Sequence, residues 1–166
     1  MSVRFNVDEV FQIAQHIERN GARFYRRGAE IVADPGHREV LLRLAATEDA
    51  HEQVVAAFRA GLTESERTPI ALDPDDQVVR ALQLQVIADG HVFKVDEDPC
   101  ERLTGKETVE AILRMAIDLE KDSVVFYTGI KEMVPERLGR DTVDDIINTE
   151  MSHIAILSEK LSSLEG

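Results

Sequence analysis

Apolar residues recur at intervals of three and four along most of this chain, which is the spacing of an amphipathic α-helix and not the alternation of a β-strand. The first stripe predicts a helix over residues 6–33, and the second predicts a helix over 37–60 after the turn sequence ADPG. Two more long helices are predicted over 106–133 and 135–164, with Thr104 as the candidate cap before the third helix. No segment predicts a strand.

The connection between the second and third helices is longer than the others. Residues 62–76 and 94–105 are predicted to be linkers because they are polar and contain proline, and the sequence QVVRALQLQVIADGHVF between them predicts a shorter helix. The predicted fold class is all-α: one domain over residues 1–166, in which two helical hairpins form a four-helix bundle. The long crossover, about 62–105, contains the short helix.

The two predicted hairpins share several residues at equivalent positions. A shift of 102 positions, without a gap, aligns about 4–61 with about 106–164. Each half has a Glu, a Phe-Tyr pair six and seven residues later, and a Glu-x-x-His sequence thirty residues after the first Glu. One such pair could arise by chance, but two pairs at one offset are hard to dismiss. The repeated residues are Glu18 and Glu120, Tyr25 and Tyr127, Glu48 and Glu150, and His51 and His153.

The repeated glutamates and histidines lie on the apolar stripes of their helices, so they are predicted to point into the core. Four carboxylates and two imidazoles would meet there, at a desolvation cost on the order of several kcal/mol per charge. Two divalent cations would balance the four carboxylate charges and would use the neutral imidazoles as ligands. The sequence therefore predicts a two-metal site whose ligands are Glu18, Glu48, His51, Glu120, Glu150 and His153.

The spacing also suggests a role for each ligand. Residues three apart share one face of a helix, so Glu48 and Glu150 can each bridge two metals while the histidine three positions later binds one of them. Glu18 and Glu120 would then be terminal ligands. Mixed carboxylate and imidazole ligands suit iron or manganese, with zinc as a competitor, and leave open positions for a small oxidant. A symmetric polar network without metal is the alternative.

The chain has two tyrosines, Tyr25 and Tyr127, and each lies seven residues after a proposed ligand. We interpret each hydroxyl as a donor to a ligand carboxylate, because groups that contact metal ligands orient them. The alternative is that both rings only pack in the core.

Charge and composition exclude several classes of function. With 19 basic and 32 acidic residues the formal net charge is −13, which argues against a basic surface that binds nucleic acid or anionic lipid. The N-terminal sequence lacks the apolar core of a secretory signal, and no later apolar run is long enough to span a bilayer, so we expect a cytoplasmic protein. A single cysteine excludes both an internal disulfide and a four-cysteine metal site.

The doubled layout of Glu, Phe-Tyr and Glu-x-x-His resembles the rubrerythrin branch of the ferritin-like di-iron carboxylate proteins, over nearly the whole chain. The resemblance implies a ferritin-like bundle in which the six predicted ligands hold two iron ions. It also implies reduction of hydrogen peroxide, or of oxygen, with electrons from the di-iron centre. Some related proteins oxidise and store iron instead.

Two departures from the family pattern limit this interpretation. A terminal rubredoxin domain with Cys-x-x-Cys pairs is absent from the sequence, so electrons would come from an external donor such as a rubredoxin. Ser123 stands where the family has an additional Glu, three residues after the third-helix ligand. The leading hypothesis is a rubrerythrin-like di-iron oxidoreductase that acts on peroxide or oxygen with an external electron donor. The alternatives are an iron-handling protein without repeated turnover and a structural bundle that holds zinc. A homodimer is expected, and its long linkers would permit exchange of hairpins.

Overall fold

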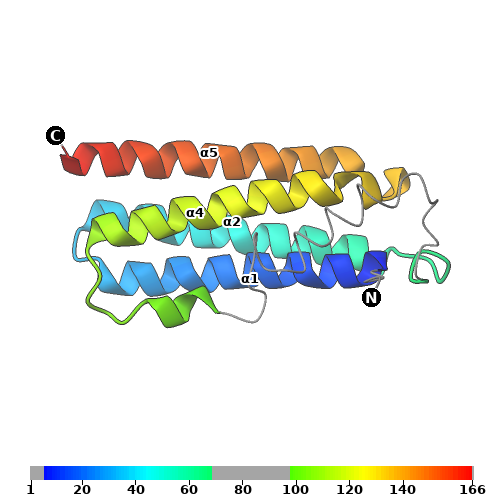
Figure 1. The fold of residues 1–166 in the computed structure, drawn as a ribbon, viewed down its shortest axis with the longest axis horizontal. Helices are drawn as coiled ribbons and strands as arrows, with labels where there is room; N and C mark the ends of the chain where they lie inside the picture. The colour runs from blue at the N-terminus through cyan, green and yellow to red at the C-terminus, as the bar shows by residue number, and fades with distance from the viewer. Residues whose placement is uncertain (1–5, 69–97, 166) are drawn as a thin grey trace, which may run out of the picture.

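Four long helices make up the structure. The computed structural model describes residues 6–68 and 98–165, and within these residues it contains no strand. None of the described helices is both long and apolar enough to cross a membrane. The predicted all-α class is confirmed, while the short helix predicted in the crossover falls in residues 69–97, outside the described part. The long helices are α1 (Val7–Ile31), α2 (Pro35–Ala60), α4 (Val109–Ile130) and α5 (Arg140–Glu165) (Figure 1).

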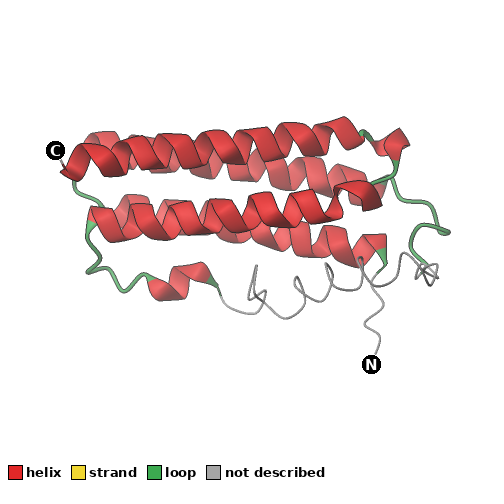
Figure 2. Ribbon diagram, turned by 45° about the horizontal axis from the view of Figure 1, so that its top comes forward, coloured by secondary structure: helices red, strands yellow, loops and turns green. Residues whose placement is uncertain are grey.

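The four helices lie side by side along one axis (Figures 1 and 2). Helix α1 packs chiefly against α2, and α4 packs chiefly against α5, so the bundle consists of two helical hairpins. The helices α2 and α4 run in the same direction, because the connection after α2 begins at one end of the bundle and α4 begins at the other (Figure 1). This is the bundle topology with one long crossover. The expected homodimer stays a prediction.

The N-terminal caps of α1 and α4 occupy equivalent positions of the repeat. Asn6 caps α1 through a capping box, in which its Oδ1 accepts from the Glu9 amide at 2.8 Å and the Glu9 carboxylate accepts from the Asn6 amide at 3.0 Å. Thr108, which is 102 positions later, accepts from the Ala111 amide at 3.1 Å. The prediction of Thr104 as the cap was wrong. Its hydroxyl and amide instead donate to the Glu107 carboxylate, which closes the preceding loop.

The turn between α1 and α2 lies two residues earlier than predicted. Helix α1 ends at Ile31, and Pro35 and Gly36 begin α2 instead of lying in a turn before it. Asp34 is the cap of α2, and its Oδ1 accepts from the His37 amide at 2.8 Å. Proline suits the first position of a helix because the amide that it lacks would have no partner there.

The turn between α4 and α5 is longer than predicted. Helix α4 ends at Ile130, and residues Lys131–Met133 continue as one 3₁₀ turn. The fourth helix was predicted from residue 135, but it begins at Arg140. Gly139 explains the difference, because its φ of 88° lies in the left-handed region, which a right-handed helix does not contain.

Apolar side chains fill both ends of the bundle. One cluster includes Phe11, Phe58 and Phe126, and the other includes Phe24, Leu41 and Leu157; every one of these side chains is buried. The repeated glutamates and histidines belong to neither cluster, although they are buried as well. The core is therefore divided into two apolar parts by a polar layer, and the apolar burial at both ends is what can offset the cost of that layer.

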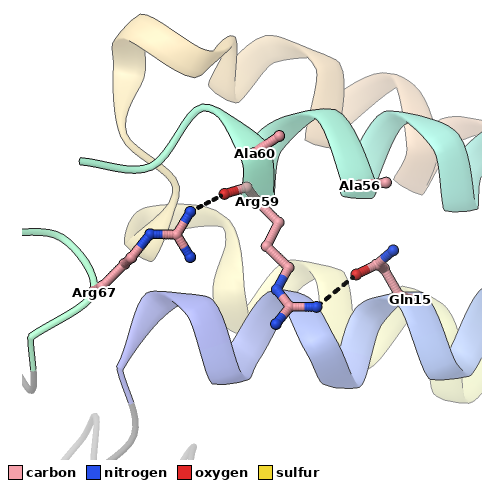
Figure 3. A pocket seen from close by; sticks show the side chains of 5 residues that line it. All are labelled: Gln15, Ala56, Arg59, Ala60 and Arg67. Carbon is pink, nitrogen blue, oxygen red and sulfur yellow. Dashed lines mark hydrogen bonds between the residues drawn. The ribbon is translucent and has the colours of Figure 1, made fainter. Parts of the chain in front are cut away.

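Arg59 in the last turn of α2 and Arg67 in the loop after it hold the beginning of α1. The Arg59 guanidinium donates two hydrogen bonds of 3.0 Å to the Asp8 carboxylate and contacts Gln15. Arg67 donates to Asp8 and, at 2.9 Å, to the Arg59 carbonyl oxygen. Figure 3 shows these arginines around a surface pocket of about 350 Å³, which Ala56 and Ala60 also line. None of the predicted ligands lines this pocket, and its arginines are used in holding α1 to α2.

We predict that the hydrogen bonds of Asp8 with Arg59 and Arg67 stabilise the protein only at pH values where Asp8 is ionised. Its hydrogen bonds with Arg59 lower the pKa of Asp8 below the ordinary value of 3.8. Stabilisation from such a group is complete above the unfolded-state pKa and is lost as the pH falls through the folded-state pKa. Asp8→Asn should therefore lower the free energy of unfolding by about 1 kcal/mol at neutral pH.

Urea unfolding of both proteins as a function of pH measures this effect. The difference should shrink as the pH falls below 3.8 and through the lowered pKa of folded Asp8, because a protonated Asp8 resembles asparagine. A difference of equal size at neutral pH and at pH 3 would contradict the prediction.

Candidate metal centre

All six predicted ligands lie in the polar layer, and each of the four long helices contributes to it. Helices α1 and α4 each contribute one Glu, and α2 and α5 each contribute the Glu and the His of a Glu-x-x-His sequence. Potential ligand atoms that lie within 4.8 Å of one another form two groups, and both groups include Glu48 and Glu150. One group adds Glu18 and His51, and the other adds Glu120 and His153. The arrangement is that of two adjacent sites with two shared carboxylates.

Glu150 lies between the two histidines. Its Oε1 is 2.9 Å from His51 Nδ1, and its Oε2 is 3.1 Å from His153 Nδ1. The imidazole rings face each other with centroids 6.4 Å apart. Each histidine also has a glutamate from α1 or α4 beside it. His51 Nδ1 lies 3.5 Å from Glu18, and His153 Nδ1 lies 3.2 Å from Glu120.

Each tyrosine donates to a carboxylate of the other hairpin. Tyr25 on α1 donates to Glu120 on α4, and Tyr127 on α4 donates to Glu18 on α1. Burial, followed by the nearby carboxylate charges, raises the pKa of both tyrosines well above the usual value, so the hydroxyls keep their protons. Each Phe-Tyr pair packs edge to face, with ring centroids 5.8 Å and 5.4 Å apart. The aromatic pairs thus hold the hydroxyls against the two terminal glutamates.

Several polar atoms of the layer have no hydrogen-bond partner. Buried Lys and Arg are missing from the described residues, so no such cation neutralises the carboxylates. Unsatisfied buried polar groups cost free energy, and this cost is removed when a cation coordinates them. The donor set of four carboxylates and two imidazoles therefore fits two divalent metal ions. The atoms without a hydrogen bond are Glu18 Oε2, Glu48 Oε1, Glu150 Oε1 and Oε2, His51 Nδ1 and His153 Nδ1, although both imidazole nitrogens lie in ion-pair contact with Glu150.

The carboxylates differ in how easily they ionise. Burial raises the pKa of Glu18 and of Glu48, and it raises the pKa of Glu120 to about 8. Burial also acts on Glu150, but contacts with both histidines outweigh it and bring its pKa to about 2. Glu150 is therefore the one carboxylate of the set whose pKa lies below the ordinary value.

The histidines are the counter-charges of the layer in the metal-free fold. Burial by itself would lower the pKa of His51, but contacts with Glu150 and Glu18 outweigh it and raise the pKa to about 9. Burial is likewise outweighed at His153, where the contacting glutamates raise the pKa to about 12. A metal ligand must be deprotonated, so a cation that enters the layer displaces these protons.

Sequence reasoning passed over Gly21, which the structure places against this layer. A Cβ atom at position 21 would lie 3.1 Å from Glu48 Oε2. The repeat contained a signal for it, because the equivalent position of the second hairpin is Ser123, which is 4% exposed. The two halves of the layer therefore differ at this one position facing a shared carboxylate.

Comparisons with known proteins give one informative match. No family model and no curated protein sequence matches this chain. The crystal structure of a Thermotoga maritima protein, provisionally assigned as a ferritin-like diiron-carboxylate protein, superposes with a TM-score of 0.75. The two chains are 23% identical, and the match covers 96% of each. This likeness shows that the chain has the ferritin-like fold, and the fold carries a buried cluster of carboxylates and imidazoles with the donor set of a two-metal site.

We predict that Tyr25→Phe and Tyr127→Phe each weaken the binding of divalent metal by about tenfold, because each removes the donor that orients one terminal glutamate. Calorimetric titration with Mn²⁺ measures the affinity, and thermal unfolding checks that the fold is kept. Phe11→Leu is the matched control, since this ring is equally buried but packs against Phe58 and makes no hydrogen bond to the layer. Unchanged affinity in both tyrosine variants would mean that the rings only fill space.

Proposed function

We propose that this protein is a rubrerythrin-like di-iron oxidoreductase that reduces hydrogen peroxide, or oxygen, with electrons from an external donor. The observation that carries the proposal is the buried layer of four carboxylates and two imidazoles whose unpartnered atoms converge on two adjacent positions. The fold of the Thermotoga maritima structure supports it, as does the donor set, which suits iron and manganese.

The residues of the layer and those around it would have different roles in the reaction. When bound, two iron ions would supply two electrons and Lewis acidity. Glu18, Glu48, His51 and Glu150 would hold one ion, and Glu48, Glu120, Glu150 and His153 would hold the other. The tyrosine hydroxyls would fix the terminal glutamates, and the two apolar clusters would exclude bulk water from the layer.

The proposed reaction needs two electrons and two protons. Hydrogen peroxide with two electrons and two protons gives two molecules of water, and two bound iron ions would supply these two electrons. An external reductant such as a rubredoxin would then return them, because the chain itself has one cysteine, which does not suffice for an iron–sulfur site of its own. Peroxide consumption should therefore depend on a donor.

Anaerobic titration with Fe²⁺, followed by addition of hydrogen peroxide, tests the proposal. We expect two Fe²⁺ per chain and rapid formation of a diferric absorption band. With reduced rubredoxin present, peroxide should be consumed over many turnovers, and Glu48→Ala should abolish this activity because Glu48 belongs to both ligand groups. A single oxidation that no donor reverses would contradict repeated turnover.

Iron handling without repeated turnover is the second candidate. Ser123 favours it, because this buried residue provides no carboxylate where the rubrerythrin pattern has one, and it lies on α4 three residues after Glu120. Uptake of clearly more than two Fe²⁺ per chain, with no dependence of peroxide loss on a donor, would support this role.

A structural zinc site is the third reading of the same ligands. In that case Zn²⁺ should bind far more tightly than Fe²⁺, and the parent protein should have no redox activity. Glu48→Ala should then lower the thermal stability of the zinc-loaded protein strongly, since the free energy of metal binding contributes to folding. Retention of iron in the presence of equimolar zinc would exclude this reading.

A further inference from the structure

The two shared glutamates of the layer do not adopt equivalent positions. Glu150 contacts the histidine of its own Glu-x-x-His sequence, with Oε2 at 3.1 Å from His153 Nδ1. Glu48 does not contact its own histidine in this way. Its Oε1 lies 3.4 Å from His153, and the ion-pair contacts of His51 are with Glu18 and Glu150. The two halves of the layer therefore differ in their contacts, although the sequence repeats the same ligand residues.

Gly21 provides the space that this asymmetry requires. A Cβ atom there would lie 3.1 Å from Glu48 Oε2 and 3.5 Å from Glu48 Cδ and Cγ, so a side chain at this position would press against the carboxylate and shift it by a few tenths of an ångström. The equivalent residue of the second hairpin, Ser123, has a side chain in the corresponding place. The absence of a Cβ at Gly21 leaves room on α1 for the Glu48 carboxylate, whose other oxygen contacts His153.

The two prospective metal positions consequently differ before any metal arrives. His153 Nδ1 has carboxylate oxygens of Glu48, Glu120 and Glu150 within 3.4 Å. His51 Nδ1 has oxygens of only two glutamates within 3.5 Å. Cations bind more tightly where more negative ligands converge, so the His153 position offers the stronger site.

We propose that the two metal ions load in order, first beside His153 and then beside His51, and that Gly21 is the positioning residue that sets this order by leaving room for Glu48 to lie nearer to His153 than to His51. This inference rests on the proposed two-metal function. The second ion binds more weakly because Glu48, which belongs to both ligand groups, must shift from its contact with His153 toward His51 to hold it. Gly21 acts through Glu48 and has no side chain of its own to bind metal.

Calorimetric titration with Co²⁺, accompanied by visible absorption spectra that report the cobalt coordination, tests this order. The wild-type protein should bind two Co²⁺ per chain in two steps whose dissociation constants differ by at least about tenfold. Gly21→Ala should tighten the weaker step by about tenfold, because the methyl group displaces Glu48 toward His51. Gly21→Ser, which copies the residue of the second hairpin, should act in the same direction.

Gly28→Ala is the matched control. It introduces the same change in the same helix, and its Cβ would meet Ile112 and Leu41 of the apolar core at 3.1 and 3.4 Å instead of a glutamate. Both alanine variants should raise or lower helix stability alike, but only Gly21→Ala should change the ratio of the two cobalt affinities. His153→Ala should remove the tighter step, and His51→Ala should remove the weaker one.

The possible results separate this inference from the proposed function. Two equal steps in the wild-type protein, an unchanged ratio in both Gly21 variants, or a tight step that survives His153→Ala would overturn the loading order while leaving a two-metal protein. No cobalt binding by the wild-type protein would overturn the proposed function and this inference together.

Discussion

The burial of four carboxylates and two imidazoles at the middle of an apolar bundle is the constraint on which the rest of the structure depends. Charged groups of one sign cannot share a dry interior without compensation. In the metal-free fold the compensation comes from protons, which the histidines hold because glutamates surround them, and from the tyrosine hydroxyls that donate to two of the glutamates. Divalent cations would replace the protons and also satisfy the atoms that have no partner.

The burial of the two apolar clusters can offset the free-energy cost of burying this polar layer. They lie on both sides of it, and each includes residues from both hairpins, so that the helices stay packed even though the centre of the bundle is polar. Tyr127 belongs to one cluster and Tyr25 to the other, and each ends in a hydroxyl that reaches the layer. The same side chains therefore contribute to core packing and to the orientation of the glutamates, which links the stability of the bundle to the geometry of the site.

The symmetry of the sequence repeat is useful for binding two ions but is not complete. Equivalent glutamates and histidines give two similar positions, and the shared carboxylates would keep two ions close together. The difference between Gly21 and Ser123 changes the space beside one shared carboxylate only. Ser123 also removes a carboxylate that the rubrerythrin pattern has, so the layer is closer to a general di-metal centre with six ligands than to the full pattern of that branch.

The sequence by itself determined the number and type of the long helices and which residues meet in the polar layer. Hydrophobic periodicity and a repeat without gaps can both be read from the order of the residues alone. It misplaced the turns, since it could not show that Pro35 begins a helix or that Gly139 adopts a left-handed conformation. It also could not show that each tyrosine donates to a glutamate of the other hairpin, which is 95 positions away in one case and 109 in the other. Nor could it show that the Glu48 carboxylate lies beside Gly21. Only the tertiary structure decided these features, because they depend on how closely one helix approaches another and on which side chain fills the space between them.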